Sequence, residues 1–366
     1  MRAASLDALV VTHLPNVRYL TGFSGTAGVC VLLPSRCFLV VDFRYLTAAR
    51  ELARDLEGAP IAVEAVERTY EEVVVSVLRR EQCLRIGVEA AWLSVSRFNA
   101  MAGALAAMAP FPLQSDHPVP VLVPTERVVE RVRIVKDAGE VETLREAARR
   151  LSAIARRLAS FVTPGRRERD VAVDLETAMR EAGFSRPAFD TIVASGPNSA
   201  FPHARPTDRL LEAGEPTVLD FGGVYDGYCV DLTRTVQLGA PTEALRRLYE
   251  AVEEANKAAI GVVRPGVRPS AIDAAARAVL ETHGLGAAFG HGTGHGLGLE
   301  IHEEPRVARE IAGLPDEPVE PGMVFTIEPG AYVPGVGGVR IEDDVLVTAE
   351  GCDVLTDAPK RIEVRV

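Results

Sequence analysis

The hydrophobic pattern of the first third of the chain alternates between two periods. Short apolar runs predict strands, and longer segments with apolar residues three or four positions apart predict helices. The strands are expected at 9–12, 27–33, 38–42 and 84–88, and the helices at 45–56, 70–80 and 93–108. Strands that alternate with helices indicate an α/β domain.

A proline-rich stretch follows this domain. Prolines at this density favour an extended connection between domains. They stand at positions 110, 112, 118, 120 and 124. We therefore place a domain boundary near residue 125, with an N-terminal domain at 1–125 and a second domain at 126–366.

Helical spacing returns beyond this boundary. It covers 137–161, and further helices are expected at about 168–182, 242–263 and 270–283. Apolar, glycine-punctuated segments typical of buried strands lie between and after these helices. The pattern predicts an α+β domain whose helices cover a curved, largely antiparallel sheet.

The second domain contains a weak internal duplication. V-T-P-G-R-R at 162–167 recurs as V-R-P-G-V-R at 263–268, each between two helical stretches. Later in each copy comes a pair of carboxylates with glycines between them, first Asp220 with Asp231 and then Glu328 with Glu342. Each pair is expected on the two arms of a β-hairpin. The repeat predicts two similar half-domains related by a pseudo-twofold axis.

These four carboxylates and His295 indicate a metal site. Ionised carboxylates rarely lie in apolar segments unless they are paired or bound to metal. Four of them in one cavity would not all stay ionised without cations, and two divalent ions carry four positive charges. Oxygen-rich ligands with one imidazole favour Mn, with Co or Zn as alternatives. Paired ions about 3.5–4 Å apart activate water, which predicts a hydrolase.

The glycines around His295 indicate its backbone conformation. Gly290, Gly292, Gly294, Gly296 and Gly298 alternate with other residues, which excludes a helix and predicts an extended strand with close neighbours. Several motifs of other enzyme classes fail here. H-E-E-P-R at 302–306 lacks the second histidine of a zinc protease, and D-F-G at 220–222 lacks the other kinase motifs.

Composition excludes some function classes. The 366 residues carry a net charge of −11 without long runs of lysine or arginine, which argues against nucleic-acid binding. No run of 18 apolar residues is present, and the N-terminus lacks the pattern of a signal peptide. Five scattered cysteines without a C-x-x-C pair predict reduced thiols. We expect a cytoplasmic protein with no membrane partner.

Five motifs follow one another in the second domain. They are N-S-A-F-P-H at 198–203, L-D-F-G-G-V-Y-D-G-Y-C-V-D-L-T-R-T at 219–235, H-G-T-G-H-G-L-G-L-E-I-H-E at 291–303, E-P-G-A-Y at 328–332 and G-G-V-R-I-E-D-D at 337–344. Together they resemble those of the pita-bread metallopeptidase family, which includes Xaa-Pro dipeptidases (prolidases), aminopeptidase P and methionine aminopeptidase. V-R-Y-L-T-G-F-S-G at 17–25 resembles the creatinase-type N-terminal domain, which methionine aminopeptidases generally lack.

The resemblance implies a role for each metal ligand. Asp220 would hold one ion, and His295 with Glu328 would hold the other. Asp231 and Glu342 would bridge the two ions. Glu328 would also carry the proton from the attacking water to the leaving nitrogen.

Other residues are implied around the ligands. His302 would stabilise the developing oxyanion, and His203 and His291 would line a proline pocket or assist proton movement. Arg340, two residues before Glu342, suits the orientation of carboxylates. Tyr332 is expected to pack or to form a hydroxyl hydrogen bond rather than to contact substrate.

The activity implied is hydrolysis of the Xaa-Pro bond at the N-terminus of dipeptides or short peptides, by a homodimer. Prolidase and aminopeptidase P share all these motifs, so the sequence leaves that choice open. A general aminopeptidase of the same fold is one alternative. A non-enzymatic interaction protein on this fold is another, and the presence of all five ligands argues against it.

Overall fold

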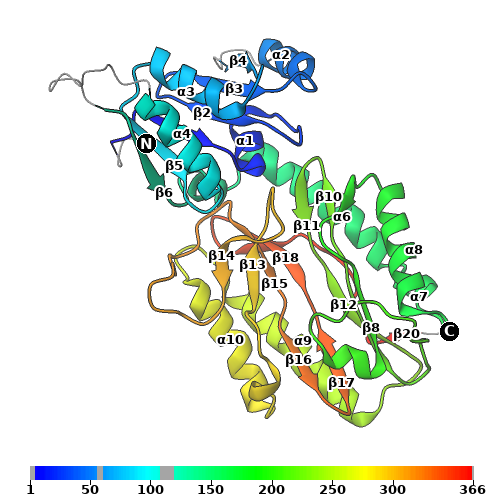
Figure 1. Ribbon diagram of the computed structural model, residues 1–366. Helices are drawn as coiled ribbons and strands as arrows, with labels where there is room; N and C mark the ends of the chain where they lie inside the picture. Colours follow the sequence, from blue (N-terminus) through cyan, green and yellow to red (C-terminus); the bar gives the residue numbers. More distant parts are fainter. Residues whose placement is uncertain (1–4, 56–60, 108–118, 365–366) are drawn as a thin grey trace. The chain divides into compact units, whose positions relative to one another are not determined.

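The chain folds into two units, Met1–Val132 and Arg133–Val366, in the computed structural model (Figure 1). The division falls slightly beyond the boundary expected near residue 125. The structure describes residues 5–55, 61–107 and 119–364. Within these residues, no helix combines the length and apolar character needed to cross a membrane. The five cysteines are free thiols.

Unit 1 contains a six-stranded sheet in the order β4-β3-β2-β1-β5-β6. β2 pairs antiparallel with β1 and β3, while the β3–β4, β1–β5 and β5–β6 pairs are parallel. The strands are β1 (Ala8–Val11), β2 (Val29–Leu32), β3 (Cys37–Val41), β4 (Ile61–Ala65), β5 (Arg85–Glu89) and β6 (Val121–Thr125).

Helices cover both faces of this sheet. Alternate residues of β1 point to opposite faces, so Ala8 and Val10 join one core while Leu9 and Val11 join the other. The first core includes α3 and α4, and the second includes α1 and α2. The helices are α1 (Leu14–Thr21), α2 (Leu46–Asp55), α3 (Tyr70–Arg80) and α4 (Val95–Ala107).

Every strand and helix expected in this unit is present, with shifts of a few residues at the ends. Three elements were not expected. α1 is only eight residues long, too short for a clear period, and begins with a proline in its first turn. β4 is only partly buried. β6 lies at the sheet edge, where Pro124 is tolerated. Some positions named in the sequence analysis lie outside the described residues, namely 56, 108, 110, 112 and 118.

Unit 2 begins with the end of α5 (Glu130–Arg133). Its helices are α6 (Ala138–Ala155), α7 (Leu158–Phe161), α8 (Glu168–Glu181), α9 (Glu243–Val262) and α10 (Pro269–Thr282). The single helix expected over 137–161 is wrong, because the chain tightens after α6. The Arg157 N–H donates to the Ile154 carbonyl three residues back, and this turn brings both Leu158 and Phe161 into the core.

The strands of unit 2 form small, mostly antiparallel sheets. Their orders are β20-β12-β9-β8, β11-β10-β7, β14-β13-β15-β18-β19 and β16-β17. The strands are β7 (Arg186–Pro187), β8 (Ile192–Ser195), β9 (Pro216–Asp220), β10 (Gly223–Tyr225), β11 (Tyr228–Val230), β12 (Thr233–Leu238), β13 (Gly294–Gly296), β14 (Glu303–Val307), β15 (Val324–Ile327), β16 (Gly330–Val333), β17 (Gly337–Arg340), β18 (Asp343–Val347), β19 (Cys352–Val354) and β20 (Glu363–Val364).

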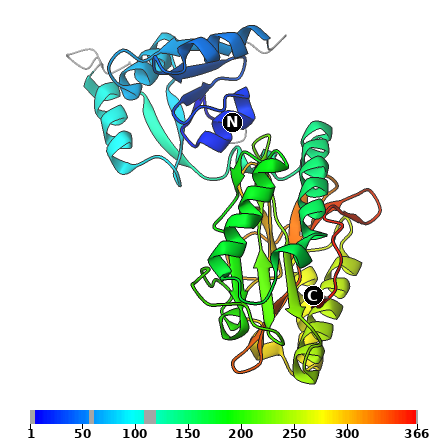
Figure 2. The same ribbon diagram turned by 90° about the vertical axis from the view of Figure 1, so that its right-hand side faces the viewer.

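The expected duplication is visible in these strands. In β9–β12 and again in β15–β18, the outer strands pair antiparallel and the inner strands form a hairpin beyond them. Each half has its own hydrophobic core, with α6, α7 and α8 in the first and α9 and α10 in the second. Figure 2 shows the green helix α8 and the yellow helix α10 on different sides of the strands. The α+β fold with a pseudo-twofold repeat is confirmed.

Candidate metal centre

The four carboxylates occupy equivalent places in the two halves of unit 2. Asp220 ends β9 and Glu328 follows β15 directly. Asp231 and Glu342 lie in the two-residue breaks between β11 and β12 and between β17 and β18. Each therefore stands where the chain passes from the outer ladder to the inner hairpin.

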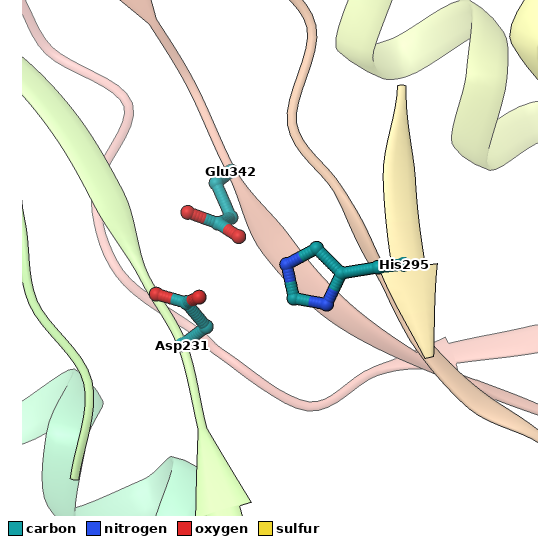
Figure 3. A group of neighbouring side chains, drawn as sticks. All are labelled: Asp231, His295 and Glu342. Carbon is teal, nitrogen blue, oxygen red and sulfur yellow. The ribbon is translucent and has the colours of Figure 1, made fainter. Parts of the chain in front are cut away.

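Three of the expected ligands lie in direct proximity. Asp231, His295 and Glu342 each offer one ligand atom, and these atoms lie within 4.8 Å of one another. Figure 3 shows the two carboxylates side by side, with the imidazole ring pointing toward them. The three residues come from the β11–β12 break, β13 and the β17–β18 break.

The other two expected ligands adjoin this group. Nε2 of His295 lies 3.4 Å from Oε1 of Glu328. Asp220 lies opposite Thr233 in the β9–β12 ladder, and Oγ1 of Thr233 donates to Glu342, which places Asp220 beside the group. All five residues predicted as ligands therefore gather in one region of unit 2.

The glycines on both sides of His295 allow neighbouring backbone segments to pack closely against β13. A Cβ atom at Gly294 would lie 1.9 Å from the carbonyl oxygen of Thr326, and one at Gly296 would lie 2.1 Å from that of Glu304. Neither position accepts a larger residue without backbone movement. The extended strand expected around His295 is thus present, with other backbone segments of unit 2 close to it on both sides.

Burial sets the charge state of these groups. It raises the pKa of Asp231 and that of Glu342 well above their usual range, and the neighbouring carboxylates add to the rise. Burial also raises the pKa of Glu328, although the charges of His291 and Arg340 oppose this. The pKa of His295 is lowered by burial, which favours the neutral ring that binds a metal.

The residues present fit divalent cations. Oδ1 of Asp220 and Oε1 of Glu342 are buried and have no hydrogen-bond partner among the described residues. Unsatisfied buried oxygens of this kind are costly, and a cation would satisfy them. Nδ1 of His295 lies 3.1 Å from the Gly296 carbonyl, so donation there leaves Nε2 available on the carboxylate side.

Neighbouring hydroxyl and amide groups hold the carboxylates in place. Oγ1 of Thr233 donates to Oε2 of Glu342 at 2.6 Å, and the Leu232 N–H donates to Oδ1 of Asp231 at 2.8 Å. Oγ1 of Thr326 donates to Oε1 of Glu328 at 3.2 Å. The two threonines were not predicted, but each stands two positions from a ligand, on the same face of an extended chain.

Arg340 connects several parts of the site. Its Nη2 lies 2.5 Å from Oδ2 of Asp220, and its Nη1 donates to the Tyr332 hydroxyl at 2.6 Å and to the Pro202 carbonyl at 3.1 Å. Its Nε donates to Oγ1 of Thr233. Arg340 is only 3% exposed, so it supplies an unscreened positive charge beside the carboxylates.

The three predicted histidines lie around the ligands at different depths. The ring centroids of His302 and His295 are 4.3 Å apart, and His302 is exposed. Nε2 of His291 lies 3.0 Å from the Tyr332 hydroxyl, so Tyr332 forms the hydroxyl hydrogen bond that was expected. His203 is exposed, and its charge adds to the effect of burial in lowering the pKa of His302 and of His291.

Asn256 on α9 is a supporting residue that the sequence did not reveal. It is fully buried, and its Nδ2 donates to the carbonyls of Ile327 at 3.0 Å and Ile341 at 3.3 Å. These carbonyls directly precede Glu328 and Glu342. An asparagine within a helical pattern gives no sign of such contacts, because they depend on the packing of α9 against the second hairpin.

Comparison with known proteins identifies the family of this chain. Metallopeptidase family M24 matches residues 142–349, and the Creatinase/Prolidase N-terminal domain matches residues 1–135. An uncharacterized peptidase of Bacillus subtilis is 36% identical over 357 residues, which is 98% of this chain and 95% of the relative. The chain therefore belongs to metallopeptidase family M24.

Two solved structures resemble the whole chain. The Xaa-Pro dipeptidase from Bacillus anthracis has a TM-score of 0.90 and 36% identity, covering 100% of this chain and 96% of that one. The X-Pro aminopeptidase from Thermotoga maritima has a TM-score of 0.87 and 30% identity, covering 100% of this chain and 99% of that one. Both likenesses extend through the two units.

Proposed function

We propose that this chain hydrolyses the Xaa-Pro bond at the N-terminus of dipeptides or short peptides, with two divalent metal ions, most suitably Mn, with Co or Zn as alternatives. The observation that carries this proposal is the convergence of Asp231, His295 and Glu342 within 4.8 Å, with Glu328 and Asp220 beside them. The similarity to an Xaa-Pro dipeptidase and an X-Pro aminopeptidase supports the substrate class.

Each ligand has a distinct place in the proposed centre. Asp220 would hold one ion and His295 with Glu328 the other, while Asp231 and Glu342 would contact both. When bound, such a pair of ions polarises a carbonyl and lowers the pKa of water. Arg340 would orient Asp220, since the two side chains form an ion pair at 2.5 Å and the guanidinium stays protonated.

Side chains of the protein would transfer the proton, stabilise the oxyanion and contact the proline ring. Glu328 would take the proton of the attacking water and pass it to the leaving nitrogen, a role that its raised pKa suits. His302 would donate a hydrogen bond to the carbonyl oxygen as negative charge develops there. His203 and His291 would flank the proline ring or assist proton movement.

The proline preference has a physical reason. An Xaa-Pro bond is a tertiary amide without an N–H group. A protease that recognises the scissile N–H loses that contact with proline. A site that instead polarises the carbonyl and encloses the ring does not need it, whereas a secondary amide would leave a donor unpaired at a cost of about 1–3 kcal/mol.

Arg306 favours dipeptides as substrates. It lies directly opposite His295 in the β13–β14 ladder, so the two side chains leave the sheet on the same face. Arg306 is exposed, and a guanidinium group binds a carboxylate well. It would bind the free carboxylate of Xaa-Pro. The likeness to the Thermotoga aminopeptidase favours longer peptides as the second candidate.

Hydrolysis assays on three substrates test the proposal. With Mn(II) present, we expect Ala-Pro to be cleaved faster than Ala-Pro-Gly, and Ala-Ala to remain mostly intact. Faster cleavage of Ala-Pro-Gly would support the aminopeptidase. Equal rates on all three would indicate a general aminopeptidase, and no cleavage by the metal-loaded protein would favour an interaction protein. We also expect a homodimer, which light scattering coupled to size-exclusion chromatography would test.

A further inference from the structure

Glu168 is a buried carboxylate that the proposed mechanism does not use. It is the first residue of α8 and has no exposed surface. In the described part of the chain it forms no ion pair with lysine or arginine. A buried, unpaired carboxylate persists only if hydrogen bonds replace its lost hydration. Its hydrogen-bond donors therefore show what it stabilises.

These donors come from both ends of one loop. Oε1 accepts from the backbone N–H and the hydroxyl of Ser195, each at 2.7 Å. Oε2 accepts from the backbone N–H of Thr207 at 3.0 Å and from its hydroxyl at 2.6 Å. Nδ2 of Asn198 lies 3.1 Å from both oxygens. Glu168 thus closes the loop 196–206 at its base.

The middle of this loop lies against the metal centre. Oγ of Ser199 accepts from the Gly338 N–H at 2.8 Å, and a Cβ atom at Gly338 would lie 1.9 Å from the Ser199 carbonyl oxygen. The Pro202 carbonyl accepts from Arg340, which pairs with Asp220. The next residue is His203. The loop is therefore fixed at its base by Glu168 and beside the ligands by β17.

We propose that Glu168 is a positioning residue whose carboxylate holds the loop 196–206 in the shape that presents His203 to the substrate. This role rests on the proposed function of the site. A loop that is ordered before binding loses less conformational entropy when substrate arrives. Loss of the anchor should therefore raise KM more than it lowers kcat.

Glu168→Gln tests this role, because it keeps the size and removes the charge that attracts the donors. We expect kcat/KM for Ala-Pro to fall about tenfold, mainly through KM, with the metal content unchanged. Thr207→Val, which removes one donor without disturbing the carboxylate, should give a smaller effect in the same direction. Asp316→Asn is the matched control, since Asp316 accepts from the backbone N–H and hydroxyl of Ser270 at the start of α10. We expect it to leave KM unchanged.

A double-mutant cycle separates positioning from general destabilisation. If Glu168 acts through His203, Glu168→Gln should have little further effect on KM in a His203→Ala background. Effects that multiply would overturn the proposal, as would an equal rise of KM in Asp316→Asn.

Hydrogen exchange gives a measurement that does not depend on activity. In Glu168→Gln the amides of 196–206 should exchange faster, while those around Asp316 should not. Unchanged exchange in this loop would refute the anchor even if the enzyme works as proposed. If the wild-type protein cleaves no Xaa-Pro peptide but the loop exchanges faster in the variant, the proposed function fails and the anchor stands.

Discussion

The two carboxylate hairpins of unit 2 share a backbone plan but differ in their chemistry. In β9–β12 the ladder between the outer strands reaches Asp220 opposite Thr233, and in β15–β18 it reaches Ile327 opposite Asp343. The first hairpin contributes two aspartates and the second two glutamates. Only the second half adds an imidazole to the proposed ligands, that of His295. The repeat therefore duplicates the scaffold and not the set of ligands.

Each hairpin also holds proposed ligands of the other in place. Arg340 of the second pairs with Asp220 of the first, and Thr233 of the first donates to Glu342 of the second. The N–H of Asp231 donates to Oδ2 of Asp344 at 3.1 Å. The candidate metal centre thus lies at the contact between the two hairpins, which we call the seam, and neither half holds all of its residues.

Metal removal should give the largest effect, because the proposed reaction depends on ions that residues of both halves would hold. We expect chelation to abolish Xaa-Pro hydrolysis and Mn(II) to restore it. Asp231→Asn and Glu342→Gln, one from each half, should each weaken metal binding strongly. Metal content by atomic emission and rates on Ala-Pro would check this. Full activity in a verified metal-free sample would contradict the proposed centre.

Glu328→Gln should have the next largest effect, and Asp220→Asn is its counterpart in the other half. The glutamine can neither carry a proton nor balance metal charge, so we expect turnover to fall by about 10²–10⁴-fold. Asp220→Asn should act mainly through metal affinity and recover part of its rate in excess Mn(II). Kinetics across a metal titration would distinguish the two. A Glu328→Gln variant with normal turnover would exclude the proton transfer.

The sequence indicated the proposed ligands more fully than the residues that hold them in place. Carboxylates in apolar segments stand out because burial of charge needs a reason, so Asp220, Asp231, Glu328 and Glu342 could be named from the chain alone. Asn256 and Glu168 could not, since polar residues on helices are ordinary and their partners lie far along the chain. The helix break at Arg157 escaped for a related reason, because the tertiary packing of Leu158 and Phe161 overrode a continuous helical period.

Asn256 offers a further test of the difference between the two hairpins, because its side-chain amide donates hydrogen bonds only to the second hairpin. Asn256→Asp replaces the amide donor with an acceptor and removes both bonds to the carbonyls before Glu328 and Glu342. We expect metal affinity to fall about 10–100-fold, as for other groups that orient ligands. Competition with a chelating dye would measure this. Lys360→Met, which removes the cation that donates to Oδ1 of Asn256 at 2.7 Å, is the control and should weaken binding less.

The pH dependence of stability should separate the metal-free and metal-loaded proteins. Asp231 and Glu342 have raised pKa values in the folded metal-free chain, whereas unfolded values are about 3.9 and 4.3. The stability they contribute is present below those values and is lost as pH rises through the folded pKa. Metal binding needs the ionised forms, so it should stabilise more as pH rises. Melting temperatures at about pH 5 and about pH 8, with EDTA or Mn(II), should therefore diverge, and parallel values would contradict this.

Two threonines offer the smallest and most closely matched comparison. Oγ1 of Thr233 reaches across the seam to Glu342 at 2.6 Å, and Oγ1 of Thr326 bonds within its own half to Glu328 at 3.2 Å. Valine has the same shape without the hydroxyl. Each threonine also accepts one N–H, Thr233 from Nε of Arg340 and Thr326 from the His295 backbone, so each variant also loses one accepted bond, and the loss from the charged Arg340 adds to the effect of Thr233→Val.

The difference between the two variants therefore reports on the hydrogen bonds that cross the seam against those within one half. A hydrogen bond to a charged group contributes about 1.5–3 kcal/mol, and the shorter one should lie nearer the upper end. We expect Thr233→Val to weaken metal binding about tenfold more than Thr326→Val, since 1.4 kcal/mol corresponds to about a factor of ten. Calorimetric titration of both variants with Mn(II) would measure this. A larger loss in Thr326→Val would mean that contacts within one half, rather than those across the seam, set the strength of the metal centre.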